Sequence, residues 1–266
     1  MKNSPLLHLS VLTLILAAPA CEFLHGTFHH DGTSYSESNG VLYADDVPLR
    51  FERWIKLEPP LAAGSQISMA TYTGEVTLSA ATAGEASALE LHLFSEIEND
   101  GGVLVKDGKL ATHSDTDHKL AINGVRGSVP ADVSLDIETG TGDLSLKGLS
   151  GKSSIKISTG TGRSTLEGCQ VASVALETGT GDMTMRDVHS TTLGIDTGTG
   201  ETRLTGCAAD ELNFSSGTGD LRLDDCHFKE SKLDSGTGDI RLRKGSTLGS
   251  ETHDLGTGSV KTSDGE

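Results

Sequence analysis

Residues 136–146 read Asp-Ile-Glu-Thr-Gly-Thr-Gly-Asp-Leu-Ser-Leu, and the Thr-Gly-Thr-Gly segment within them recurs along the chain, sometimes as a close variant. The first glycine of each copy lies at Gly140, Gly160, Gly179, Gly198, Gly217, Gly236 and Gly256, with spacings of 20, 19, 19, 19, 19 and 20 residues. A fixed period of this length is the signature of a repeat architecture, in which each unit packs only on its neighbours.

Aligning the copies on the first glycine reveals two strands in each repeat. Apolar residues stand five and three positions before it, at Leu135, Ile155, Val174, Leu193 and Leu212, and at Ile137, Ile157, Leu176, Ile195, Phe214 and Leu233. Others stand four and six positions after it, as at Leu144 and Leu146 or Leu221 and Leu223. Alternation with period two predicts strands that each have one buried face.

Two kinds of turn separate these strands. The paired glycines predict a corner, because glycine accepts positive φ without a steric penalty. The predicted turn glycines are Gly140, Gly142, Gly160, Gly162, Gly179, Gly181, Gly198, Gly200, Gly217, Gly219, Gly236 and Gly238. A second turn is predicted where Gly148, Gly168 and Gly206 alternate with Asp187 and Asp225.

The repeat predicts an all-β fold: a parallel β-solenoid, by default right-handed, with rungs of about nineteen residues stacked about 4.8 Å apart. Regular rungs are expected over residues 131–266. Residues 60–130 keep the register near Ile67 and Met69 and then lose it, so they are interpreted as irregular N-terminal rungs or a cap. Residues 21–59 begin with a polar, Gly/Ser-rich stretch and are interpreted as a tether.

Residues 1–20 have the features of a signal peptide: Lys2, then an apolar run from Leu6 to Ala18, then small residues. Residues 18–21, Ala-Pro-Ala-Cys, resemble the lipobox of bacterial lipoproteins. That resemblance implies an acylated Cys21 that attaches the protein to a membrane without spanning it. An ordinary cleaved signal with an incidental cysteine is the alternative. We therefore expect an exported, lipid-anchored protein of the cell envelope, on the periplasmic side or on the outer surface.

The composition limits the partners. The formal net charge is −17, and it becomes −18 without residues 1–20, which hold Lys2 and no acid. Such an acidic surface repels phosphate backbones, so no nucleic-acid partner is expected. Aromatic residues make up only 4% of the chain, and the 33 glycines indicate a narrow core with many turns.

A column of acids follows the glycine corner and allows two readings. Stacked carboxylates at Glu201, Asp220 and Asp239 could bind calcium through oxygen ligands. However, arginine stands two residues after each of them, so a surface ion-pair ladder is favoured and no metal or other cofactor is predicted.

Cysteines and histidines are the remaining candidate ligands. Cys169, Cys207 and Cys226 share a column with Leu149 and Val188, which favours buried free thiols, although Cys207 and Cys226 could form a disulfide. Solvated, flexible segments are preferred over metal sites for two histidine groups. They are His25, His29 and His30 with Asp31, and His113 and His118 with Asp115 and Asp117.

The repeats, as in residues 137–146, resemble the bacterial putative adhesin family, a β-strand-repeat domain of unknown function. The resemblance covers roughly residues 60–266 and implies a β-solenoid at the cell envelope, with no catalytic motif to transfer. We therefore expect a non-enzymatic lipoprotein acting as a surface scaffold or adhesin-like interaction module. Its partners would be the membrane, envelope proteins or surface glycans. The alternatives are a carbohydrate-active β-helix, resembling a polysaccharide lyase or hydrolase, and a calcium-binding repeat protein.

Overall fold

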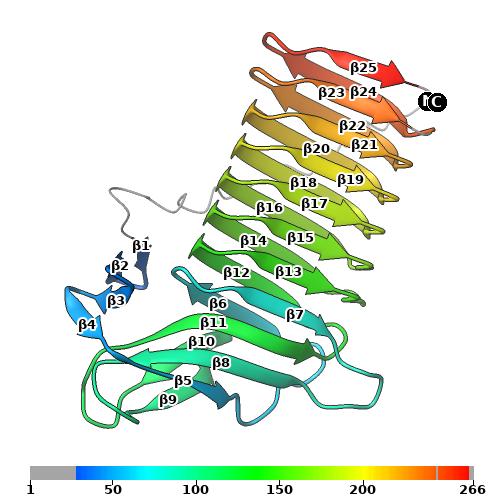
Figure 1. Cartoon of the computed structure of the whole chain (residues 1–266). Coiled ribbons are helices and arrows are strands. Elements are labelled where there is room, and N and C mark those ends of the chain that lie inside the picture. The colour runs from blue at the N-terminus through cyan, green and yellow to red at the C-terminus, as the bar shows by residue number, and fades with distance from the viewer. Residues whose placement is uncertain (1–27, 244, 264–266) are drawn as a thin grey trace, which may run out of the picture.

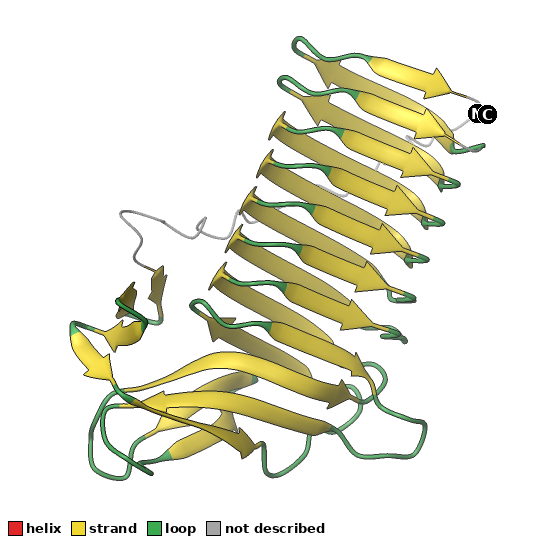
Figure 2. Ribbon diagram, in the orientation of Figure 1, coloured by secondary structure: helices red, strands yellow, loops and turns green. Residues whose placement is uncertain are grey.

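The structure is a computed structural model that describes residues 28–243 and 245–263. Within these residues all regular secondary structure is β-strand, and two long sheets face each other along an elongated prism (Figure 1). The loops lie at the corners of the prism and around its N-terminal end (Figure 2).

The strands of the described residues form three sheets. Sheet 1 has the spatial order β24 (Thr247–Leu255), β22 (His227–Ser235), β20 (Ala208–Thr218), β18 (His189–Thr199), β16 (Ser173–Thr180), β14 (Ser154–Thr161), β12 (Ser134–Thr141), β6 (Gln66–Thr71), β10 (Lys109–His113) and β9 (Gly102–Lys106). Sheet 2 has the order β25 (Val260–Ser263), β23 (Ile240–Arg243), β21 (Leu221–Asp224), β19 (Thr202–Thr205), β17 (Met183–Arg186), β15 (Ser164–Glu167), β13 (Leu144–Lys147), β7 (Val76–Ala80), β11 (Leu120–Val129), β8 (Ala88–Ser95) and β5 (Phe51–Lys56). The N-terminal sheet is β1 (Phe28–His30), β2 (Thr33–Ser38), β3 (Val41–Ala44) and β4 (Val47–Leu49).

The rungs pair in parallel, in the register that the sequence predicts. Leu135 lies opposite Ile155, and Leu144 lies opposite Ser164, as their shared columns require. In Figure 1 the strands of sheet 2 face the viewer and run to the right, whereas those of sheet 1 run to the left behind them. The coil climbs toward the C-terminus as it turns, so the solenoid is right-handed.

The core is one continuous column between the two sheets. Phe214 is 2% exposed, and its register partners Ile195 and Leu233 are equally inaccessible. In the last rung His253 lies opposite Leu233 and Glu251 lies opposite Ser231, and these two polar side chains pair at 3.2 Å. The C-terminal rung is therefore polar, as expected of an exposed solenoid end.

The corner glycines are needed for a different reason from the one predicted. A positive φ occurs at Gly162, Gly181 and Gly200, with values of 142°, 159° and 141°, but not at the first glycine of any copy. Close stacking on the rung below is common to the corner glycines from Gly179 to Gly238 and to Gly142 and Gly162. A Cβ on Gly200 would lie 2.0 Å from the carbonyl oxygen of Gly181, and one on Gly198 would lie 2.5 Å from that of Gly179. Here the absence of a side chain matters more than freedom in φ.

The second turn follows the prediction. Its residues all adopt the left-handed conformation, with φ between 52° and 66°, and they are Gly148, Gly168, Asp187, Gly206 and Asp225. Aspartate replaces glycine there because it tolerates this region better than most residues.

An antiparallel cap closes the N-terminal end of the solenoid. Strands β8 and β5 continue sheet 2 beyond β11, and the β9–β10 hairpin continues sheet 1 beyond β6. At the first corner Asn123 replaces a missing rung: its Oδ1 accepts hydrogen bonds from the backbone N–H groups of Tyr72, Thr73 and Gly74 at 2.8–3.1 Å. One buried side chain thus satisfies three donors.

Residues 28–56 differ from the predicted tether. They form strands β1–β5, and Phe28, Leu42 and Leu49 are buried against Tyr72 and Ala121 of the solenoid. Few apolar residues are needed, because the solenoid supplies the other half of this small core.

Candidate functional site

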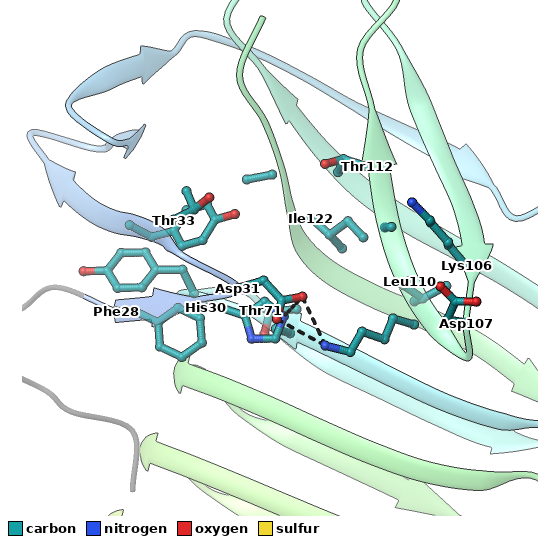
Figure 3. A pocket seen from close by; sticks show the side chains of 16 residues that line it. Phe28, His30, Asp31, Thr33, Thr71, Lys106, Asp107, Leu110, Thr112 and Ile122 are labelled. Carbon is teal, nitrogen blue, oxygen red and sulfur yellow. Dashed lines mark hydrogen bonds and ion pairs between the residues drawn. The ribbon is translucent and has the colours of Figure 1, made fainter. Parts of the chain in front are cut away.

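A pocket of about 440 Å³ lies where the N-terminal sheet meets the outside of sheet 1, and we call it the N-terminal pocket. Strands β1 and β2 supply Phe28 and Tyr35, and Leu110 and Ile122 line it from β10 and β11 (Figure 3). Burial is the main cause that raises the pKa of Tyr35. The pocket is large enough for a small ligand, and its lining mixes apolar side chains with polar and charged ones.

A polar network forms one rim of the N-terminal pocket. His30 Nδ1 lies 2.8 Å from Glu138 Oε2 on the solenoid, and its Nε2 lies 3.6 Å from Asp31 Oδ2. Lys109 Nζ lies 3.1 Å from the other oxygen of Asp31 (Figure 3). These contacts attach the N-terminal sheet to two separate parts of the solenoid.

The predicted flexibility around His29, His30 and Asp31 is therefore wrong, since β1 holds His29 and His30 and ion pairs hold Asp31; His25 lies outside the described residues. The second histidine group is also ordered by local contacts: the hydroxyl of Ser114 donates to Asp100 and accepts from the backbone N–H of His118 at 2.9 Å. Among the residues that the structure describes, no three His, Cys, Asp or Glu side chains converge as metal ligands.

The acids after the glycine corner form an ion-pair ladder on the outside of the solenoid. Arg222 Nε lies 3.0 Å from Glu201 Oε1, and Arg241 Nη1 lies 2.6 Å from Asp220 Oδ2. The same guanidinium reaches Asp239 Oδ2 at 3.0 Å. Each carboxylate of this ladder is thus neutralised by a cation of the chain itself.

The pKa directions agree with these contacts. The Lys261 ammonium and the Ser259 hydroxyl lower the pKa of Asp239 to about 2. The backbone N–H of Asp239 and the Arg241 guanidinium lower that of Asp220. The predicted ion-pair ladder is present, so a calcium ion would have to displace existing partners.

The three cysteines are buried and free, as predicted, and no disulfide joins Cys207 to Cys226. Burial raises the pKa of the Cys169 thiol, and a hydrogen bond to Cys207 together with burial raises that of Cys226. The same hydrogen bond lowers the pKa of Cys207, but all three side chains are fully buried in the main hydrophobic cluster, so this column is part of the core.

Next to the cysteine column, the chain leaves the second turn and a groove runs along the outside of the solenoid. We call it the second-corner groove. It consists of two adjoining hollows of about 510 and 370 Å³ that share His189 and Ser190. Gln170 lines the first hollow, and His227 and Phe228 line the second. Sequence alignment of the rungs misses this groove, because the residue type in its column varies from copy to copy.

A stack of flat side chains on the outside of the cap was also missed. Trp54, the only tryptophan of the chain, is 42% exposed and lies parallel to His92, with ring centroids 4.6 Å apart. The Arg126 guanidinium lies 3.9 Å from the centroid of the indole ring. The ring of Phe94 also packs against His92, with centroids 4.6 Å apart and the two planes tilted by 56°. Burial is the main cause that lowers the pKa of His92.

Cys21 and residues 1–20 lie outside the described part of the chain. In the part described, no helix has the length and apolar character needed to cross a membrane.

The parallel strand register defines a right-handed β-solenoid with an antiparallel N-terminal cap. On the outside of this solenoid, Glu201 and Asp220 after the glycine corners form ion pairs with arginines of neighbouring rungs. Residues 162–266 match the model of the family described as Toastrack DUF4097. The chain therefore carries, over that stretch, a β-repeat domain of unknown function, which confirms the resemblance inferred from the repeats. Curated protein sequences gave no match.

Solved structures with a similar strand arrangement include proteins from Bacteroides and Parabacteroides. A putative adhesin from Bacteroides fragilis is 16% identical, covers 80% of this chain and 96% of its own, and has a TM-score of 0.49. A putative lipid binding protein from Parabacteroides distasonis (12% identical; 80% and 96% covered) and a putative adhesin from Parabacteroides merdae (12%; 80% and 95%) both have TM-scores of 0.43. Because these TM-scores are below 0.5, we assign the fold from the strand pairing of this chain and not from these structures.

Proposed function

We propose that this protein is a non-enzymatic lipoprotein of the cell envelope, attached through an acylated Cys21, and that its solenoid is an adhesin-like interaction module. Its partners would be surface glycans or envelope proteins. The observation that supports this proposal is the regularity of the solenoid: seven successive glycine corners stack with no long insertion between them. Such a stack is a stiff rod whose sides repeat with the spacing of the strands.

The surface chemistry agrees with binding rather than reaction. Glycoside hydrolysis requires two carboxylates on opposite sides of the bond that is cleaved. In the part of the chain that the structure describes, the second-corner groove is lined by one carboxylate, Asp210, which pairs with Lys229 at 2.6 Å. The acids of the outer ladder are likewise held by cations. These arrangements favour the scaffold over the carbohydrate-active alternative.

The proposal is tested in cells that express wild-type protein or a Cys21→Ser variant. The wild-type protein should enter the membrane fraction and carry acyl mass on its N-terminal residue, and the variant should be found in the soluble fraction. Cells with the wild-type protein should adhere better to glycan-coated surfaces than cells with the variant. Release of new reducing ends from a polysaccharide by the purified protein would refute the non-enzymatic assignment, and absence of acyl mass would refute the anchor.

A further inference from the structure

The second-corner groove continues across several rungs of the solenoid. Its column contains, in strand register, Ser150, Gln170, His189, Ala208, His227 and Thr247. Five steps of strand spacing give it a length of roughly 24 Å. A groove of this shape accommodates an extended polymer that lies parallel to the solenoid axis.

Apart from Ala208, the side chains of this column are hydrogen-bonding groups above an apolar floor. Buried Val171, Ala209 and Phe228 form the floor. His227 Nδ1 lies 3.0 Å from Thr247 Oγ1, which orients the imidazole across the rungs. Amide, hydroxyl and imidazole groups can both donate and accept hydrogen bonds, which suits a ligand rich in hydroxyl groups.

The small side chain of Ala208 leaves room for the second hollow. Ala208 stands between His189 and His227, so the two imidazoles are two rungs apart, about 9.6 Å by strand spacing. Among the residues that the structure describes, these two imidazoles belong to no group of three or more His, Cys, Asp or Glu side chains that could hold a metal ion. The small side chain of Ala208 leaves space between two hydrogen-bonding side chains for one flat, polar unit of a polymer.

The backbone of the groove excludes a peptide bound as an added strand. The N–H of His189 donates to Cys169 O at 2.8 Å, and the N–H of His227 donates to Cys207 O at 2.9 Å. These donors are used between rungs, whereas strand addition requires a free sheet edge. A ligand here must be held by side chains. The net charge of −17 also disfavours an anionic polymer.

We propose that the second-corner groove binds a neutral, linear polysaccharide along the solenoid axis. The rung spacing is close to the advance of one sugar unit in an extended β-linked chain, so successive sugars would meet equivalent positions of the groove. This assignment rests on the proposed function and specifies the ligand of the adhesin-like module.

The test is affinity electrophoresis of the mature full-length protein in gels that contain soluble mixed-linkage β-glucan, glucomannan or xylan. Alginate serves as the anionic comparison. We expect retardation by at least one neutral polysaccharide. The double variant His189→Ala/His227→Ala should weaken that binding about tenfold, as expected for the loss of two hydrogen-bonding groups.

His253→Ala is the matched control, because His253 is an exposed histidine on β24 with its own partner, Glu251. It should bind like the wild type. A second variant, Ala208→Gln, fills the hollow without removing a hydrogen-bonding group and should also weaken binding. Circular dichroism and thermal unfolding confirm that each variant is folded.

No retardation by any neutral polysaccharide overturns the proposal, as does binding that the groove variants leave unchanged. Preferential retardation by alginate, or displacement of the glycan by unstructured peptides, also overturns it. Two other outcomes would contradict the proposed function and leave the glycan-binding groove supported. One is groove-dependent binding accompanied by release of reducing ends, and the other is groove-dependent binding by a protein that carries no acyl mass.

Discussion

The stacked glycine corners allow a direct test, because two glycines close together in the sequence have opposite surroundings. A Cβ on Gly200 would lie 2.0 Å from Gly181 O, about 1 Å closer than real Cβ contacts allow. The neighbouring rungs would have to separate there. This would stretch the bond from Gly181 N to Thr199 O (3.1 Å) and that from Met183 N to Glu201 O (2.9 Å). Overpacking, two weakened hydrogen bonds and the positive φ of 141° together should cost Gly200→Ala about 3–5 kcal/mol.

Gly194 provides the matched control in the same rung. It lies in β18, and the nearest atom to an added Cβ is Val174 O at 3.9 Å, an ordinary contact. Gly194→Ala should leave the free energy of unfolding unchanged or raise it by up to ~1 kcal/mol, because alanine restricts the unfolded chain. Urea unfolding followed by circular dichroism compares the two variants, provided that their m-values agree with the wild type. Equal stability of Gly200→Ala and Gly194→Ala would refute the stacking explanation.

Three further predictions concern the core, the ladder and the N-terminal sheet. Phe214→Ala should cost ~3–5 kcal/mol in urea unfolding, since the rungs cannot collapse onto the cavity, whereas Thr205→Ala on the outward face should stay within about 0.5 kcal/mol; comparable losses would disprove the register. Because the folded-state pKa of Asp239 is lowered to about 2, its stabilising effect is complete above the unfolded value of 3.8 and is lost as pH falls toward 2. Stability measured through that window should decline, while chelators leave it unchanged; a large calcium-dependent rise in melting temperature would restore the metal reading. Tyr72→Ala should release residues 28–49 to limited proteolysis without lowering rung stability; undiminished resistance would show that other contacts hold that sheet.

The rungs could be predicted from the sequence because the same pattern of apolar residues and glycines recurs in every copy. A register shift of one residue would expose an entire apolar column, and every copy penalises that shift in the same way. Leu135, Leu204 and Phe214 therefore appear in the core where the alignment placed them. The glycine corner was located correctly, but its cause was not, because the neighbour that excludes a Cβ lies nineteen residues away in sequence.

The N-terminal sheet and the groove could not be predicted for different reasons. Strands β1–β4 are three to six residues long, and the core that stabilises them is completed by Tyr72 and Ala121, which no local pattern links to them. The second-corner groove arises from a difference between copies, the small Ala208 between two histidines, which averaging over the repeat removes. The apolar alternation shared by all copies thus predicts the solenoid, but it does not predict features that depend on a single rung.

The position of the antiparallel cap has a consequence for the order in which the chain folds. The β9–β10 hairpin joins strands that are nearly adjacent in sequence, whereas every rung must close a loop of about nineteen residues on an existing edge. During N-terminus-first synthesis the cap emerges before the repeats and offers β6 and β7 as the first template. Later rungs can then add one at a time, so nucleation is separated from growth. Hydrogen exchange should accordingly show protection that decreases from β7 toward β25, and the C-terminal rungs should open first under mechanical load.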